Sequence, residues 1–258
     1  MKKKFHLKNL LTATNILILI LILLYVLDKY LPFPNNYNGF SAWDSERSPA
    51  LNYISGSCGG LLTNYLALGG MLQNGYAIYR HITAAFLHGR LLYLITNIAG
   101  LYFIGNYAEK RFGCILTYLI FLIVAFTESF ITTPLYCAIA PDKAQTTWAA
   151  VSTGASGGIF GLIGFTLAAL FFDVKSFKKI GIPTIIVSAI YGVLTTYIAS
   201  FGFTTVCHNV SLLIGIFLGT ALILPFFLLK KGKFAPKAES FQAIENSVLK
   251  ETDDIEQK

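Results

Sequence analysis

The amino-acid sequence predicts an all-α polytopic membrane protein, in the form of a bundle of six transmembrane helices. The first observation is composition: of the 258 residues, 55% are hydrophobic and only 13% are charged. The second is that the apolar residues form long blocks, without the alternation of a half-buried strand or the polar face of a surface helix. Both features are typical of a multi-span membrane protein and argue against a soluble enzyme domain.

Six apolar blocks qualify, or nearly so, as membrane spans. A hydrocarbon core of about 30 Å takes about 20 residues of α-helix. The blocks are Leu10–Leu27, Thr83–Ile104, Cys114–Ser129, Ser156–Phe172, Ile182–Val206 and Val210–Leu229. The predicted organisation is therefore a cytoplasmic N-terminus at residues 1–9, a membrane domain at residues 10–229 and a cytoplasmic tail at residues 230–258.

The first block is predicted to be a retained span and not a signal peptide. Four lysines precede it, as in a signal peptide, but its apolar run from Leu10 to Leu27 is longer than a typical signal core. The residues that follow, Asp28 to Pro32, offer no cleavage site with small side chains.

The lysines and arginines predict the orientation of the bundle. Positive residues follow the second, fourth and sixth blocks, at Lys110 and Arg111, at residues 175–179 and at residues 230–237. With six alternating helices, these turns lie on the same side as the lysine-rich N-terminus, which is then the cytoplasmic side. We expect both termini there. The net charge of +7 is explained by this topology and by attraction to the lipid bilayer, and implies no nucleic-acid partner.

Two connections are long. Residues 30–81 include an apolar, glycine-rich run, for which we expect short helices beside the bundle. An outer loop is predicted from Pro134 to Thr153, which leads the chain back to the fourth block.

Small residues predict that the fourth and sixth helices touch. Lipid provides no hydrophobic force between helices, so glycines mark close contact of their backbones. The glycines concerned are Gly154, Gly157, Gly158, Gly161 and Gly164 in one stretch and Gly215 and Gly219 in the other.

Serine chemistry is indicated by two residues at matching depth. Read from the outer side, Ser156 opens the fourth block and His208 stands at the mouth of the sixth. His208 precedes Gly215 and Gly219 by seven and eleven residues, so the imidazole and these glycines share one helical face. A neutral imidazole near Ser156 can take the serine proton and later donate it to the leaving amine. We predict a Ser-His dyad without an acidic third member.

Less specific explanations exist for both residues. Serine is a common packing residue between membrane helices, and a histidine at a helix mouth can face water. His81 and His88 also lie near the outer end of the second block, and spacing alone does not decide whether one of them is the base instead.

Two other polar residues stand within the blocks. The Asn97 amide is costly to bury without partners. It either makes a hydrogen bond to another helix or donates to a developing oxyanion. Glu128, near the outer end of the third block, is interpreted as a structural residue satisfied by water or an interfacial partner.

Other protease chemistries lack their residues. A paired-aspartate site needs two buried aspartates and a zinc site needs His-Glu-x-x-His, and the chain has neither. The four cysteines show no paired metal-ligand spacing, so no metal and no cofactor are predicted. We expect Cys58, Cys137 and Cys207 toward the outer side, where a disulfide can form, and the sequence does not decide whether one does.

These residues resemble the rhomboid family of intramembrane serine proteases. The likeness runs from Tyr79 to Gly219, and the combination is specific, whereas a GxSG motif alone is a weak signal. Three blocks carry it in the family's order: Tyr79-Arg80 with Thr83 to Gly89, then Gly154 to Gly161, then His208 with Gly215 and Gly219.

The resemblance implies a role for each matching residue. Ser156 is the implied nucleophile and His208 the general base, while Asn97 and the Ser156 backbone N–H form the oxyanion hole. The residues implied to pack around this site are Phe160, Gly154 and Gly157. The resemblance also implies a rhomboid-like bundle with an outward-open catalytic cavity that admits a transmembrane substrate.

Two positions depart from the family's pattern. Tyr93 stands where a histidine commonly precedes Asn97, so a phenol replaces one oxyanion donor. Loss of one such donor can cost about 3 to 4 kcal/mol of transition-state stabilisation. Ser211 stands where the first glycine after the histidine is usual, which predicts a looser or shifted contact with the fourth helix.

We therefore predict an intramembrane serine endopeptidase that cleaves single-span transmembrane proteins near the outer face of the membrane. The alternative, motivated by Tyr93, is a catalytically weak or inactive rhomboid-like protein that binds membrane clients. A small transporter or channel is disfavoured because the chain shows no obvious inverted repeat. The resemblance favours a bacterial plasma membrane, and the oligomeric state is left open.

Overall fold

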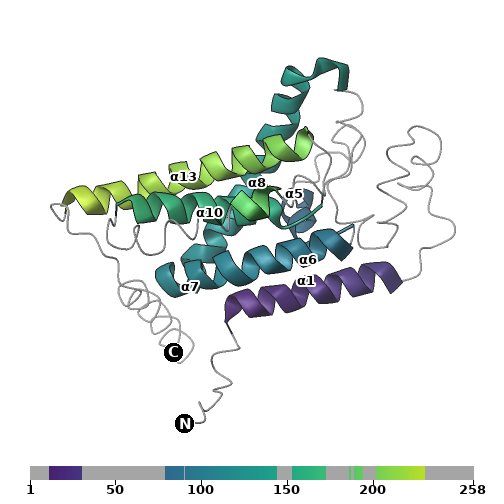
Figure 1. Cartoon of the computed structure of the whole chain (residues 1–258), viewed down its shortest axis with the longest axis horizontal. Coiled ribbons are helices and arrows are strands. Elements are labelled where there is room, and N and C mark those ends of the chain that lie inside the picture. Colours follow the sequence, from purple (N-terminus) through teal and green to yellow (C-terminus); the bar gives the residue numbers. More distant parts are fainter. Residues whose placement is uncertain are drawn as a thin grey trace, which may run out of the picture.

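Every regular element that the structure describes is a helix, which confirms the all-α class (Figure 1). The structure is a computed structural model, and it describes residues 12–30, 79–89, 91–143, 153–172, 186, 189–193 and 202–229. The main helices are α1 Ala13–Tyr30, α5 Arg80–Thr83, α6 Leu91–Gly100, α7 Asn106–Phe112, α8 Cys114–Ile139, α10 Ser156–Phe171 and α13 Phe203–Leu229. Short 3-10 turns cover Ala84–Phe86 and Pro141–Lys143, and a π-turn at Leu101–Gly105 joins α6 to α7.

Three of the described helices are long and apolar enough to cross a membrane. They are Leu91–Phe112, which combines α6, the π-turn and α7, then Cys114–Ile139, and Phe203–Pro225 within α13. Ala13–Asp28 and Ser156–Phe171 are shorter apolar helices. The protein is therefore an integral membrane protein. The six-span count stays a prediction, because most of the predicted fifth span, and all of residues 1–9 and 230–258, lie outside the described residues.

Three predicted boundaries are wrong. The second long helix begins at Leu91 and not at Thr83, because α5 and a 3-10 turn come first and Leu87 is extended. α8 continues through Pro134 to Ile139, so the predicted outer loop begins later. α13 begins at Phe203, after Gly202 at φ 120°, so His208 lies inside the helix and not at its first residue. The predicted short helices in residues 31–78 lie outside the described residues.

The N-terminus of α1 is held by a carboxylate of α7. The Ala13 N–H donates to Glu109 Oε1 at 2.9 Å, and the Thr14 N–H and hydroxyl donate to Oε2 at 2.8 and 2.7 Å. The first N–H groups of a helix have no intrahelical partner, and the positive end of the helix dipole favours an anion. Glu109 therefore caps α1 and ties it to α7.

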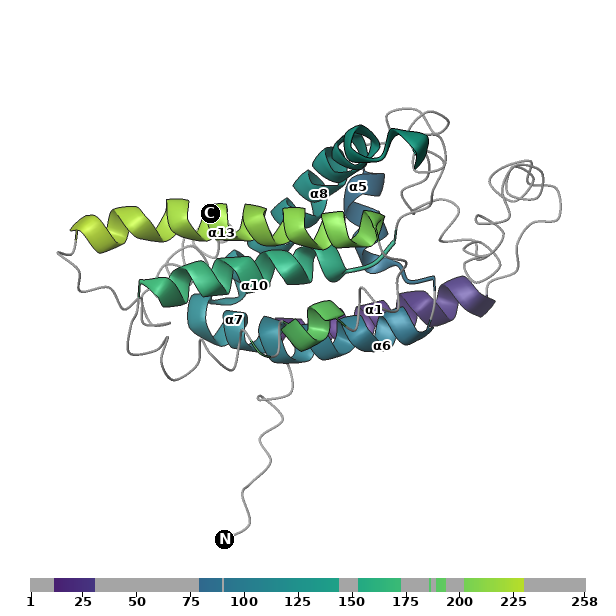
Figure 2. The ribbon, with the colours of Figure 1, turned by 45° about the horizontal axis from the view of Figure 1, so that its top comes forward.

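The strongest helix packing joins α10 to α13, which lie side by side in Figures 1 and 2. A Cβ on Gly215 would overlap the Gly161 carbonyl, and a Cβ on Gly164 would overlap the Leu212 carbonyl. Gly219 lies against Phe165 in the same way. The predicted contact between the fourth and sixth helices is confirmed, since only glycine lets these backbones approach so closely.

A neighbouring side of α10 packs on α8, which crosses the bundle steeply (Figure 2). A Cβ on Gly158 would overlap the Phe121 ring, and a Cβ on Gly161 would overlap Val124. α10 is consequently enclosed between α8 and α13, and its residues are buried almost without interruption from Gly157 to Leu170. The helix that Ser156 opens is the core of the bundle.

Replacing Glu109 with glutamine should lower the free energy of unfolding by about 1 to 3 kcal/mol, because the cap loses its charge and one of its acceptors. Unfolding in mixed detergent micelles measures the change. Asp142→Asn is the matched control, since Asp142 is exposed in the 3-10 turn and its substitution should change little. Equal effects of the two substitutions would contradict the capping role.

The Gly215→Ala variant should lose about 1 to 3 kcal/mol of stability, because its Cβ would meet backbone that does not yield easily. Gly192→Ala is the control, since its Cβ would lie 3.6 Å from Phe160, an ordinary contact. The same unfolding measurement distinguishes them, and an unchanged Gly215→Ala protein would rule out the close contact of α10 and α13.

Candidate functional site

The turn before α10 brings Ser156 to one end of the bundle. Gly154 has a φ of 126°, a conformation that other residues rarely adopt. Its N–H donates to the Ala84 carbonyl at 3.0 Å, which fastens the turn to the 3-10 segment before α6. Ser156 then begins the helix, after the fully buried Ala155.

His208 lies at the same end, where it stacks on Phe160. The two ring centroids are 4.2 Å apart and the rings are inclined by 16°. Phe160 is one helical turn after Ser156, so the stack brings the imidazole to the first turn of α10. His208 is only 5% exposed, and its Nδ1 atom is buried without a hydrogen-bond partner.

The described residues show no hydrogen bond between Ser156 and His208. Catalytic hydrogen bonds are often long in the absence of substrate and shorten in the reacting complex. The structure thus brings the two predicted residues to one end of the bundle, where the His208 ring is held by stacking on Phe160.

Asn97 completes the group from α6. Its Nδ2 donates to the Tyr93 carbonyl at 2.9 Å, and its Oδ1 accepts a hydrogen bond from the Tyr191 hydroxyl at 2.8 Å. A Cβ on Gly154 would lie 3.8 Å from Asn97 Nδ2 and 4.0 Å from Ser156 Oγ. The space that Gly154 leaves empty is therefore bordered by both the amide and the serine hydroxyl.

Of the two readings of Asn97 left open by the sequence, the structure shows the hydrogen bond between segments, since the amide oxygen accepts from Tyr191. The amide nitrogen borders the same space as the Ser156 hydroxyl, and its role as an oxyanion donor stays a prediction. At Tyr93, the backbone carbonyl contacts the amide. Whether the Tyr93 phenol can donate to an oxyanion stays a prediction.

Sequence reasoning missed Tyr191. This residue is 6% exposed, and its ring lies 5.2 Å from that of Phe160. Figure 2 shows the short green segment at residues 189–193 beside α6. The sequence did contain one signal, a tyrosine within the apolar block Ile182–Val206. A buried tyrosine hydroxyl usually finds a hydrogen-bond partner, so Tyr191 could have been expected to bond to a polar residue of another helix.

His81 and His88 make different contacts. The His81 Nδ1 atom lies 2.6 Å from Ser129 Oγ, and its ring stacks on Phe130 of α8 at 3.9 Å. His88 is 3% exposed, and burial lowers its pKa to about 4 against a smaller opposing effect of the Phe86 backbone. Neither ring makes a hydrogen bond to Ser156 in the described part of the chain, and the stack of His208 on Phe160, one turn from Ser156, favours His208 as the partner.

Glu128 has partners inside the protein, which corrects the expectation of water or an interfacial partner. It accepts a hydrogen bond from Thr132 at 2.8 Å, and the Cys207 thiol of α13 also hydrogen-bonds to it. Its Oε2 would lie 3.0 Å from a Cβ on Gly157. Glu128 lies deeper than predicted because α8 continues ten residues beyond Ser129. Cys137 and Cys207 form no disulfide with a described cysteine, and Cys58 lies outside the described residues.

Ser211 fills a position beside the Ser156 turn. It is fully buried, its hydroxyl has no hydrogen-bond partner, and its Oγ would lie 3.5 Å from a Cβ on Gly157. Ser211 thus fits against a glycine without separating the helices. Whether this serine loosens or shifts the contact relative to glycine stays a prediction.

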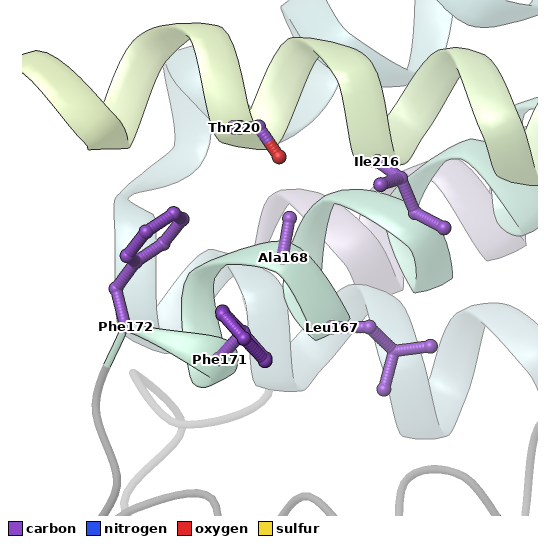
Figure 3. Close-up of a pocket in the computed structure, with 6 residues that line it drawn as sticks. All are labelled: Leu167, Ala168, Phe171, Phe172, Ile216 and Thr220. Carbon is purple, nitrogen blue, oxygen red and sulfur yellow. The ribbon is translucent and has the colours of Figure 1, made fainter.

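An apolar pocket occupies the other end of the contact between α10 and α13 (Figure 3). Its lining is apolar except for Thr220, which points from α13 toward α10. The lining residues are Leu167, Ala168, Phe171, Phe172, Ile216 and Thr220. At 1.5 Å per residue, Leu167 lies about 16 Å along α10 from Ser156, so the pocket is separate from the serine site.

Comparison with known proteins points to one family. The sequence model described as "Rhomboid domain" matches residues 76–225, a range that contains all the residues of this site. The chain is 27% identical to RHOMBOID-like protein 7 of Arabidopsis thaliana over 124 residues, which are 48% of this chain and 36% of that protein. It is 32% identical to RHOMBOID-like protein 4 of the same plant over 110 residues, 42% of this chain and 25% of that protein. The matches thus span about a third or less of these relatives.

Gly154→Ala should reduce cleavage of a membrane-anchored reporter about 100-fold or more, because a methyl group would enter the space between Ser156 and Asn97. Gly113→Ala is the matched control, since Gly113 also has a positive φ of 84° but lies between α7 and α8. Equal losses in the two variants would show that backbone strain alone is responsible, and would contradict a role for the space at Gly154.

Proposed function

The chain belongs to the rhomboid family, and on that premise we propose that it is an intramembrane serine endopeptidase. Its substrates are single-span transmembrane proteins, which it cleaves by acyl transfer to Ser156. The observation that carries the proposal is the convergence at one end of the bundle. His208 stacks on Phe160 one turn from Ser156, and the Asn97 amide borders the same empty space as the Ser156 hydroxyl.

In the proposed reaction, Ser156 Oγ attacks the carbonyl carbon of the scissile peptide bond. His208 takes the hydroxyl proton as the bond forms, and then gives it to the leaving amine as the C–N bond breaks. The first product departs and leaves an acyl-enzyme on Ser156. Water then attacks this ester, with His208 as the base again, and regenerates the serine.

The charge that develops on the substrate oxygen needs donors in the space at Gly154. Asn97 Nδ2 carries two N–H groups, of which one is directed to the Tyr93 carbonyl. The other N–H and the backbone N–H of Ser156 are the proposed donors. Loss of one donor in such a site costs about 3 to 4 kcal/mol, so the amide is central to the rate.

The membrane setting of the reaction is also a proposal. Substrate and water are proposed to reach Ser156 through a cavity open to the outer side, with both termini in the cytoplasm. The reported relatives are plant proteins, so they lend no support to a bacterial plasma membrane, which stays a prediction from resemblance.

A rhomboid-like protein that binds membrane clients with weak or no cleavage is the second candidate. It is favoured by one observation: Tyr93 stands in the position where the family commonly has a histidine donor. This candidate predicts client binding that does not depend on the Ser156 hydroxyl.

The test is cleavage of a single-span reporter by the purified protein in liposomes. The parent should cleave, whereas Ser156→Ala and His208→Ala should each reduce the rate by a factor of about 10⁴ or more. Tyr93→His should accelerate cleavage if the missing donor limits the rate.

Two control variants accompany this test. His81→Ala and His88→Ala should retain cleavage in protein that remains folded, because neither ring is hydrogen-bonded to Ser156. Retained cleavage by His208→Ala would contradict the proposed Ser156–His208 dyad. If the parent does not cleave but binds the reporter as well as Ser156→Ala does, the client-binding function is favoured instead.

A further inference from the structure

Tyr191 donates the hydrogen bond that occupies the oxygen of the Asn97 amide. The distance between the Tyr191 hydroxyl and Asn97 Oδ1 is 2.8 Å, and both residues are buried. The two residues are distant in sequence, and the bond joins α6 to the segment at residues 189–193. In such an apolar setting a hydrogen bond between two buried groups has little competition from water.

The amide has two possible orientations, and its neighbours select one. With the oxygen toward Tyr191 and the nitrogen toward the Tyr93 carbonyl, both contacts are hydrogen bonds. In the reversed orientation the amide oxygen would face the Tyr93 carbonyl oxygen, and two acceptors would meet. The selected orientation is the one that presents an N–H to the space beside Ser156.

The ring of Tyr191 is fixed independently of its hydroxyl. It lies 5.2 Å from the Phe160 ring at an angle of 34°, and a Cβ on Gly100 would lie 2.9 Å from its edge. Phe160 in turn stacks on His208. One continuous set of aromatic contacts therefore extends from the residue that holds the amide to the proposed base.

We propose that Tyr191 is a positioning residue, whose hydroxyl holds the Asn97 amide with its N–H directed at the developing oxyanion beside Ser156. The inference rests on the proposed function for its catalytic meaning. Tyr191 itself does not touch the reacting atoms, since it acts through the far side of the amide.

The experiment compares Tyr191→Phe with the parent in the reporter assay. This substitution removes the hydroxyl and keeps the ring, so the contacts with Phe160 and Gly100 persist. We expect kcat to fall about 10-fold to 100-fold with KM nearly unchanged, because a misplaced donor affects the transition state and not substrate binding. In an Asn97→Ala background the same substitution should have no further effect, because the amide that it positions is gone.

Tyr118→Phe is the matched control. The Tyr118 hydroxyl donates to Thr14 at 2.7 Å near the capped end of α1, so its loss removes a comparable hydrogen bond away from Ser156. Tyr118→Phe should leave kcat unchanged. Both variants should be compared at equal folded fraction, measured by thermal unfolding in detergent, so that a stability loss is not mistaken for a catalytic one.

The possible outcomes separate this inference from the proposed function. An active Tyr191→Phe protein with parental kcat overturns the positioning role, as does a loss that persists undiminished in the Asn97→Ala background. If the parent itself is inert, the proposed function fails. The contact is then judged by stability: coupled effects of Tyr191→Phe and Asn97→Ala on unfolding support it, and strictly additive effects overturn it.

Discussion

The close backbone contact between α10 and α13 is the constraint on which the rest of this protein depends. Lipid offers no hydrophobic gain for joining two apolar helices, so their association relies on packing of small residues. Gly161 lies opposite Gly215, and Gly157 and Phe165 lie opposite Ser211 and Gly219, with the same sequence separation in each pair. The two helices therefore run parallel and in register. This register brings the first turn of α10 and the second turn of α13 together, and with them Ser156 and His208.

Two carboxylates of the described bundle are held by hydrogen bonds. Glu109 accepts three hydrogen bonds from α1, and Glu128 is held by Thr132 and Cys207. At the site, His208 Nδ1 and the Ser211 hydroxyl are buried without partners. Buried polar atoms without partners are uncommon because they are costly, and they gather at functional positions where substrate or water completes their bonds. Thr166, farther along α10, also has a buried hydroxyl without a partner, so the position of His208 beside Ser156 is what singles it out.

Part of this arrangement could be predicted from the sequence, because it follows from spacing. The sequence spacing of His208, Gly215 and Gly219 predicted that the imidazole and these glycines share one face of the sixth helix. The glycines that follow Ser156 predicted the surface of the fourth helix that packs against this face. The helix boundaries were harder to predict from the sequence. In a soluble protein an internal proline usually ends or kinks the helix. α8 nevertheless continues through Pro134, since an apolar environment gives its backbone few alternatives to the helix. Tyr191 could not be assigned a role because its partner is in a distant segment, and hydropathy does not specify which face of one helix meets which face of another.

Covalent labelling of Ser156 by a fluorophosphonate, located by mass spectrometry of the purified protein, tests the central claim most directly. It reports on the activated serine without requiring a natural substrate. The account predicts an adduct on the peptide that contains Ser156, and its loss when His208 is replaced by alanine in a protein that remains folded. An adduct that forms equally fast without His208, or a parent in which Ser156 is never modified, would contradict the account.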